Sequence, residues 1–199
     1  LNATSLSANI QQALHLKLGN TFSELNQPDS AFFHFTKLPA WDDRNRDAHL
    51  NILQAVVEAY TKAGKYEDAL PFNLDLLEEM ERLEKSPHEL AVVHNNLGYN
   101  FNFLRDYESA NAHFKTALEL MPEKETKDIG VLQTNIGVAH FNEGDWNKSK
   151  SALLKAKVHL VKKGLEEKSQ INHLIANVYL KSKDTVSYTH LTLPTRCLG

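Results

Sequence analysis

Apolar side chains recur at helical spacing along most of the chain, and the clearest example is the stretch 96–122. There, Leu97, Gly98 and Phe101 fall on one helical face, because residues three and four positions apart are neighbours on a helix. A second apolar face follows a short polar break, and Pro122 ends it. The pattern predicts two helices joined by a tight turn.

The same pattern repeats up and down the sequence. Aligned units begin near Gln12, Leu50, Ala91, Gly130 and Ser169, so the period is 38 to 41 residues. The third position of every unit is aliphatic: Leu14, Ile52, Val93, Leu132 and Ile171. The seventh position is aliphatic as well: Leu18, Val56, Leu97, Ile136 and Ile175. A fixed period of this length indicates stacked helix pairs. We therefore predict four complete units and a fifth that breaks off near Asp184.

The most complete unit resembles the tetratricopeptide repeat (TPR) family. The residues that carry the resemblance are Leu97, Gly98, Phe101, Tyr107, Ala110, Phe114, Ala117 and Pro122. It extends over roughly residues 10–184, although the family period is about 34 residues. The longer units are similar to those of kinesin light chains and of bacterial regulatory and sensor TPR proteins. The resemblance implies an all-α fold over residues 1–184, a right-handed superhelical solenoid of antiparallel helix pairs.

Local signals predict where several helices begin and end. Gly64 favours a left-handed helix end, and the first helix of the fourth unit is expected to end at Gly144. Ser86, Pro87 and Glu89 form a strong start signal. The other candidate caps are Asp29 or Ser30 for the second helix and Thr126 or Asp128 for the fourth unit. Departures from the family pattern are Pro28 and Pro39 around a short second helix, Asn73 in place of an aromatic residue, and Lys150 and Lys157 in the fourth unit.

The resemblance also implies a binding groove lined by the first helix of each unit. The residues that family geometry places there are Asn95, Asn96, Tyr99, Asn102, Phe103, Thr134, Asn135, Val138, Phe141, Asn142, Gln170, His173 and Asn177. Most are amides and aromatics, and an asparagine side chain offers both a donor and an acceptor to a peptide backbone. The alternative is that residues such as Asn96 and Asn135 tie neighbouring helices together.

Composition narrows the classes of function. The chain of 199 residues has a net charge of -3, which does not favour nucleic acid or an anionic membrane as a partner. Its single cysteine, Cys197, allows no disulfide framework, and no apolar run approaches the ~20 residues of a membrane span. Ten histidines form no HExxH motif or close ligand pair, and no phosphate loop or catalytic triad is evident. We therefore expect no catalytic, cofactor or metal residues, and no enzyme.

These observations predict a non-catalytic scaffold that binds a protein or an extended peptide in the groove. The alternative is the sensor segment of a larger bacterial signalling protein, such as a TPR histidine kinase or transcriptional regulator. Either function is compatible with the cytoplasm or a bacterial periplasm.

The last fifteen residues, 185–199, do not continue the repeat. Val186 to Thr195 is similar to a translated sequencing adapter, a transposase end sequence read in frame. The alternative is a genuine tail that is disordered or forms a strand. Because the chain also begins at Leu1 instead of a methionine, we expect it to be an internal fragment.

Overall fold

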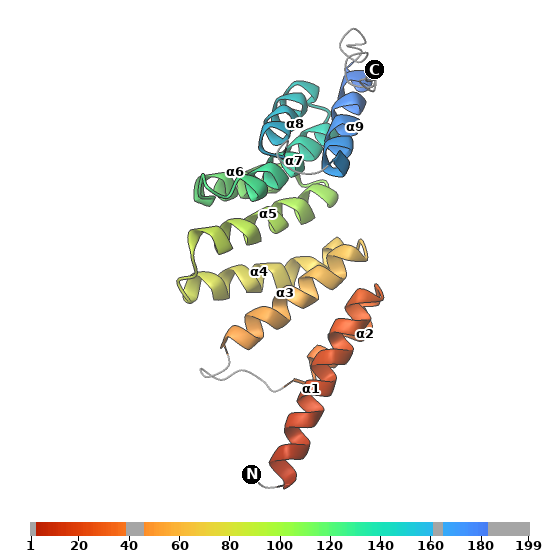
Figure 1. Ribbon diagram of the computed structural model, residues 1–199, viewed down its shortest axis with the longest axis vertical. Helices are drawn as coiled ribbons and strands as arrows, with labels where there is room; N and C mark the ends of the chain where they lie inside the picture. The colour runs from red at the N-terminus through yellow and green to blue at the C-terminus, as the bar shows by residue number, and fades with distance from the viewer. Residues whose placement is uncertain (1–2, 39–45, 161–164, 183–199) are drawn as a thin grey trace, which may run out of the picture. The chain divides into compact units, whose positions relative to one another are not determined.

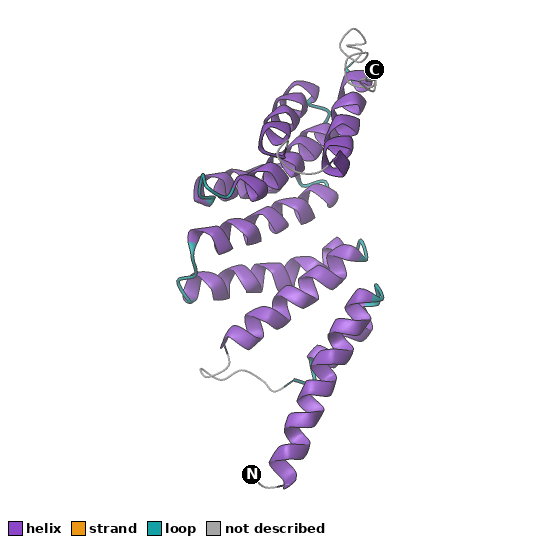
Figure 2. Cartoon of the chain, viewed as in Figure 1, coloured by secondary structure: helices purple, strands orange, loops and turns teal. Residues whose placement is uncertain are grey.

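The computed structural model describes residues 3–38, 46–160 and 165–182, and within these residues it is helical without a strand (Figures 1 and 2). The helices are α1 (Ala3–Glu24), α2 (Pro28–Phe35), α3 (Arg46–Lys62), α4 (Tyr66–Arg82), α5 (Pro87–Phe103), α6 (Tyr107–Leu120), α7 (Thr126–Glu143), α8 (Trp146–Leu160) and α9 (Leu165–Lys181). The prediction of an all-α fold is confirmed. The predicted tail, residues 185–199, lies outside the described residues.

The chain divides into two compact units, Leu1–Lys85 and Ser86–Gly199, which we call the N-terminal unit and the C-terminal unit. In the N-terminal unit, α1 packs against α2 and α3 packs against α4. In the C-terminal unit, α5 pairs with α6 and α7 pairs with α8, and α9 packs on α8. Consecutive helices therefore form antiparallel pairs, as the repeat predicts (Figure 1).

A small residue on the first helix meets a large one on the second in three of the pairs. A Cβ atom added to Gly98 would lie 2.7 Å from the Phe114 ring, and one added to Gly137 would lie 2.6 Å from Leu153 Cγ. Gly19 has the same relation to Phe35. The residue at position 20 of each of the four complete repeats is also small and fully buried: Ala31, Ala69, Ala110 and Ser149. These small residues let the two helix backbones approach closely.

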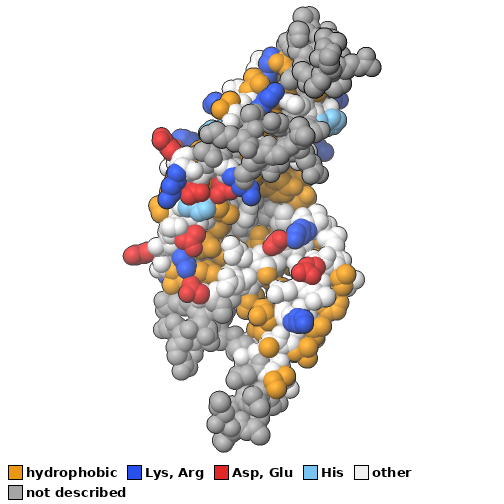
Figure 3. Space-filling view, in the orientation of Figure 1, with side chains coloured by type: hydrophobic (Ala, Val, Ile, Leu, Met, Phe, Trp, Pro, Cys, Tyr) orange, Lys and Arg blue, Asp and Glu red, His pale blue; other side chains and the backbone are white. Residues whose placement is uncertain are grey.

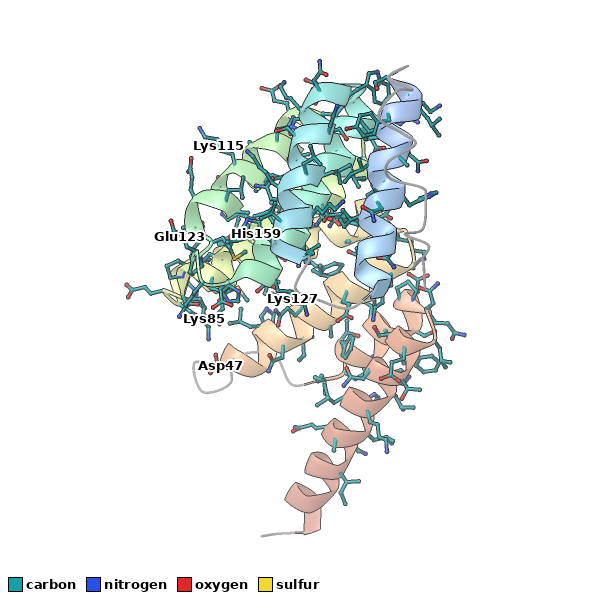
Figure 4. The ribbon with its side chains drawn as sticks, turned by 45° about the horizontal axis from the view of Figure 1, so that its top comes forward. Asp47, Lys85, Lys115, Glu123, Lys127 and His159 are labelled. Atoms are coloured by element: carbon teal, nitrogen blue, oxygen red, sulfur yellow. The ribbon has the colours of Figure 1, made fainter. Side chains whose placement is uncertain are left out.

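Most of the predicted helix ends are confirmed. Ser86 and Glu89 form a reciprocal capping box at the start of α5, with the Ser86 amide donating to Glu89 Oε2 at 3.0 Å. Gly64 and Gly144 have positive φ angles of 72° and 90°. At the end of α4, the Lys85 ammonium contacts Asp47 Oδ1 near the start of α3 at 2.8 Å (Figure 4).

Two predicted helix starts were wrong. Helix α2 begins at Pro28, so Asp29 and Ser30 lie inside its first turn instead of capping it. Helix α7 begins at Thr126 itself, and the preceding Glu125 makes no side-chain cap hydrogen bond.

Helix α2 is short, as predicted from Pro28 and Pro39, although Pro28 is its first residue and Pro39 lies outside the described residues. It has 8 residues, whereas α4, α6 and α8 have 17, 14 and 15. The short partner leaves part of α1 uncovered: Leu14 is 53% exposed, but Leu132 at the same repeat position is 0% exposed. Figure 3 shows the resulting apolar surface along α1 and α2. The exposed large apolar residues of α1, of α2 and of the turn between them are Ile10, Leu14, Leu16, Leu25 and Phe33.

Candidate functional site

The first helices of the C-terminal unit lie next to one another. Helix α5 contacts α7 directly and α7 contacts α9, whereas within the described part of this unit no comparable contact joins the second helices α6 and α8. Helices that approach more closely on one side of a stack lie on its inner side. The row formed by α5, α7 and α9 is therefore the inner side of the C-terminal unit, where the predicted groove residues lie. We call it the inner row.

Two pairs of asparagines join α5 to α7 across this row. Asn135 Nδ2 donates to Asn95 Oδ1 at 3.0 Å, and Asn142 Nδ2 donates to Asn102 Oδ1 at 3.3 Å. The partners in each pair are 40 residues apart in the sequence. At Asn135 the structure thus contains the helix-to-helix tie that we considered as the alternative to peptide binding. Each pair uses one donor and one acceptor, and an amide side chain has further hydrogen-bonding capacity.

Aromatic and apolar groups accompany the amides. The Tyr99 and Phe103 rings lie with centroids 4.7 Å apart, and Phe103 is 41% exposed. Phe141 instead packs edge-on against Trp146 at 5.2 Å, at the margin of the core between α8 and α9. Only the first of these ring pairs therefore offers an exposed ring to a ligand.

The remaining predicted residues differ in accessibility. Asn102 is buried at 3% exposure, while Asn96, Val138 and Asn177 are half-buried. Asn142 is exposed, and so are Gln170 and His173 on α9. Thr134 is half-buried, and its hydroxyl donates to the Gly130 carbonyl at 2.9 Å. The residues on α5 and α7 come together through the amide pairs, while those on α9 continue the same row.

Two pairs of histidines were missed by the sequence analysis. His94 Nδ1 lies 2.9 Å from His113 Nδ1, and His15 Nδ1 lies 3.0 Å from His34 Nδ1. In each pair the second ring stacks on a phenylalanine, Phe101 or Phe22. Burial lowers the pKa of His113, and the neighbouring His94 lowers it further. The sequence does contain a signal for these pairs, because the first and third repeats both have histidine at repeat positions 4 and 23.

A third histidine contact also escaped the sequence analysis. Ligand atoms of His88, Glu125 and Asp128 all lie within 4.8 Å of one another, a candidate group for a metal ion. His88 Nε2 contacts Asp128 Oδ2 at 2.9 Å. Both acids lie at the start of α7, where the helix dipole favours negative charge and disfavours a cation. The histidine contact and the helix end therefore account for the arrangement without an ion.

Within the described residues, no helix is both long enough and apolar enough to cross a membrane.

Comparison with known proteins gives one family model that matches part of the chain. Residues 49–123 match the family model for the tetratricopeptide repeat. The comparison with curated proteins gives no match.

Several solved structures have a similar fold. BtubC (BKLC) from P. vanneervenii matches with a TM-score of 0.68 and 19% identity, over 91% of this chain and 74% of that chain. A structure of nearly identical TPR-like repeats of a Podosopora anserina kinesin light chain matches with a TM-score of 0.68 and 12% identity. The match covers 91% of this chain and 92% of that chain. The MamA protein matches with a TM-score of 0.61 and 14% identity, over 91% and 89%. Residues 49–123 therefore match the tetratricopeptide repeat model, and the chain has the all-α fold of a TPR-like helical solenoid.

Proposed function

We propose that the chain is a non-catalytic scaffold whose C-terminal unit binds an extended peptide segment of a partner protein along the inner row. The observation that carries the proposal is the two amide pairs between α5 and α7, with the half-buried Tyr99 and the exposed Phe103 beside them. Apart from His173 and the phenol of Tyr99, the predicted groove residues carry no ionisable side chain, and none is an acid, a lysine or an arginine. The proposed ligand is therefore held through its backbone and its apolar side chains more than through its charge.

The pair of Asn95 and Asn135 offers one hydrogen-bond donor and one acceptor, as a peptide unit requires. Asn135 Nδ2 donates to Asn95 Oδ1, so the Asn135 carbonyl oxygen and the Asn95 amino group remain to face a ligand. A peptide unit carries one N–H donor and one C=O acceptor, which match this arrangement. Tyr99 lies four residues beyond Asn95 on α5, and its ring pair with Phe103 can contact an apolar side chain of the same peptide.

The proposal is tested by selecting peptides from a displayed library with the full chain and measuring the Kd of the best binder by calorimetry. Asn95→Ala combined with Asn135→Ala removes both partners of one hydrogen bond, so it leaves no buried group unpaired and preserves the fold. We expect this double variant to weaken binding about tenfold, the effect of two lost hydrogen bonds of ~0.7 kcal/mol each.

Asn147→Ala, at an exposed position on α8, is the matched control and should retain the affinity of the parent chain. The Tyr99→Ala variant tests the aromatic pair separately. An unchanged Kd in both the double variant and Tyr99→Ala, with an unchanged circular dichroism spectrum, would show that the peptide binds elsewhere.

A further inference from the structure

The N-terminal unit contains a cavity that is separate from the inner row. Its volume is about 350 Å³, within the range of small-molecule sites. Residues from α2, α3 and α4 and from the turn after α2 line it: Phe32, Phe35, Thr36, Leu38, His49, Ile52, Leu53, Val56, Phe72 and Asp75.

The cavity is a consequence of the short helix α2. In the C-terminal unit, the end of α6 covers the following first helix, with Ala117 and Met121 in one core cluster with Leu132 of α7. Helix α2 ends at Phe35, so it lacks the corresponding turns. The first half of α3 therefore presents Ile52 and Leu53 to a cavity where the C-terminal unit has a packed helix end.

Aromatic rings form one wall of this cavity. The Phe32 and Phe72 rings, which both line it, lie with centroids 5.1 Å apart. Tyr60 stacks behind Phe72 at 5.8 Å and an interplanar angle of 7°, which fixes the orientation of the Phe72 ring. Ring faces attract both apolar groups and cations. This wall therefore suits the apolar body of a ligand that also carries positive charge.

The charge of the cavity also favours a ligand that carries positive charge. Asp75 lines it and has no ion-pair or hydrogen-bond partner among the residues that the structure describes. His49 is the second ionisable lining residue, and burial lowers its pKa to about 4, against the raising influence of Glu79. His49 is therefore neutral at pH 7. Among the described residues that line the cavity, Asp75 is then the one that carries a charge, and this negative charge attracts a cation and repels an anion.

We propose that this cavity binds a small apolar amine, with its aryl or branched alkyl body against Phe32 and Phe72 and its ammonium group toward Asp75. The site is independent of the peptide site, because every residue that lines it belongs to the N-terminal unit. Neither proposal requires the other.

Three probes of one shape test the chemistry: 3-phenylpropylamine, 3-phenylpropanol and 3-phenylpropionate. Each is titrated at pH 7 into the full chain, and binding is followed by amide chemical shifts. We expect saturable binding of the amine, with the alcohol about threefold weaker, as the loss of one exposed ion pair implies. The carboxylate should bind more weakly than the alcohol. Failure of the amine to saturate, or a carboxylate that binds as tightly as the amine, would overturn the proposal.

Variants locate the site. Thr36→Phe adds a ring at an exposed position on the rim of the cavity, and Ile52→Phe fills it from α3; both should reduce amine binding at least tenfold. Asp75→Asn should remove the preference for the amine over the alcohol, while Asp68→Asn, on the same helix but outside the cavity, should keep it. If Thr36→Phe and Ile52→Phe both fold and leave amine affinity unchanged, or if Asp75→Asn retains the preference, the assignment is wrong.

Discussion

At the scale of single residues, one helix pair reverses the packing rule of the others. Position 8 of the repeat is glycine in three pairs and faces a large side chain at position 24, as Gly98 faces Phe114. In the second repeat, formed by α3 and α4, positions 8 and 24 are Val57 and Asn73, and both are buried. The larger residue on the first helix thus accompanies a smaller one on the second. Asn73 is fully buried, and neither atom of its amide has a hydrogen-bond partner among the described residues.

This reversal predicts a strong energetic coupling between the two positions. Val57→Gly alone should lower the free energy of unfolding by about 2 kcal/mol, through lost burial and the flexibility of a helical glycine. Asn73→Phe alone should cost about 1–3 kcal/mol by overpacking. The double variant should be more stable than either single variant, because it restores the glycine–phenylalanine fit and removes an unpaired amide. Urea unfolding of the full chain measures all four free energies. Simple additivity would mean that the two positions do not compensate each other.

His49 gives the N-terminal unit a pH dependence of defined sign. Burial lowers its pKa from 6.5 to about 4, so the folded state favours the neutral ring. The stabilisation is fully present above pH 6.5 and is lost as the pH falls from 6.5 to about 4. We expect a loss on the order of 2 kcal/mol, less than the full shift implies because the ring is partly exposed.

The measurement is urea unfolding between pH 7 and pH 4.5, followed by resonances of the N-terminal unit. His49→Gln should flatten the profile, since glutamine does not titrate. His173→Gln, at an exposed position in the C-terminal unit, should leave it unchanged. A parent chain and a His49→Gln variant with parallel profiles would exclude His49 as the source.

At the scale of helices, the sequence predicted the ends that depend on one local signal. Gly64 adopts the expected left-handed conformation, α7 ends next to Gly144 as expected, and Ser86 with Glu89 forms the expected box. The predicted start of α2 was wrong because two sequence signals competed there, a proline and a capping residue. Proline is favoured at the first helical position, so the helix begins at Pro28 and places Asp29 inside the first turn. The sequence alone could not rank these two preferences.

At the scale of the whole molecule, the repeat predicted which helices stack but not which side chains meet between repeats. The third and fourth units start 39 residues apart (91 and 130), which aligns Asn95 with Thr134. The observed partner of Asn95 is Asn135, 40 residues away, and the pair of Asn102 and Asn142 has the same offset. The contact of His88 with Asp128 is again 40 residues apart. Stacking therefore shifts the register by one residue, and only a structure supplies that shift.

The second amide pair should contribute to the cohesion of the C-terminal unit. Repeat proteins are stable as a sum of individual repeats and the interfaces between them, so a bond from α5 to α7 belongs to the interface. Asn142→Ala leaves the carbonyl oxygen of Asn102 without this donor at a site that is 3% exposed, which should cost about 1–2 kcal/mol. The Tyr107 hydroxyl donates to the backbone carbonyl of residue 142, so that contact survives the substitution.

A double-mutant cycle with Asn102→Ala separates the bond from the loss of buried volume. We expect a coupling energy of about 0.5–1.5 kcal/mol, measured by urea unfolding followed at resonances of α5 and α7. Hydrogen exchange should show the same change as lower protection of α7 in Asn142→Ala. Asn147→Ala on α8 lies outside the inner row and is the control, for which we expect parental stability. A coupling energy near zero would mean that packing alone joins these repeats, and that the amides on α5 and α7 are free to serve a ligand.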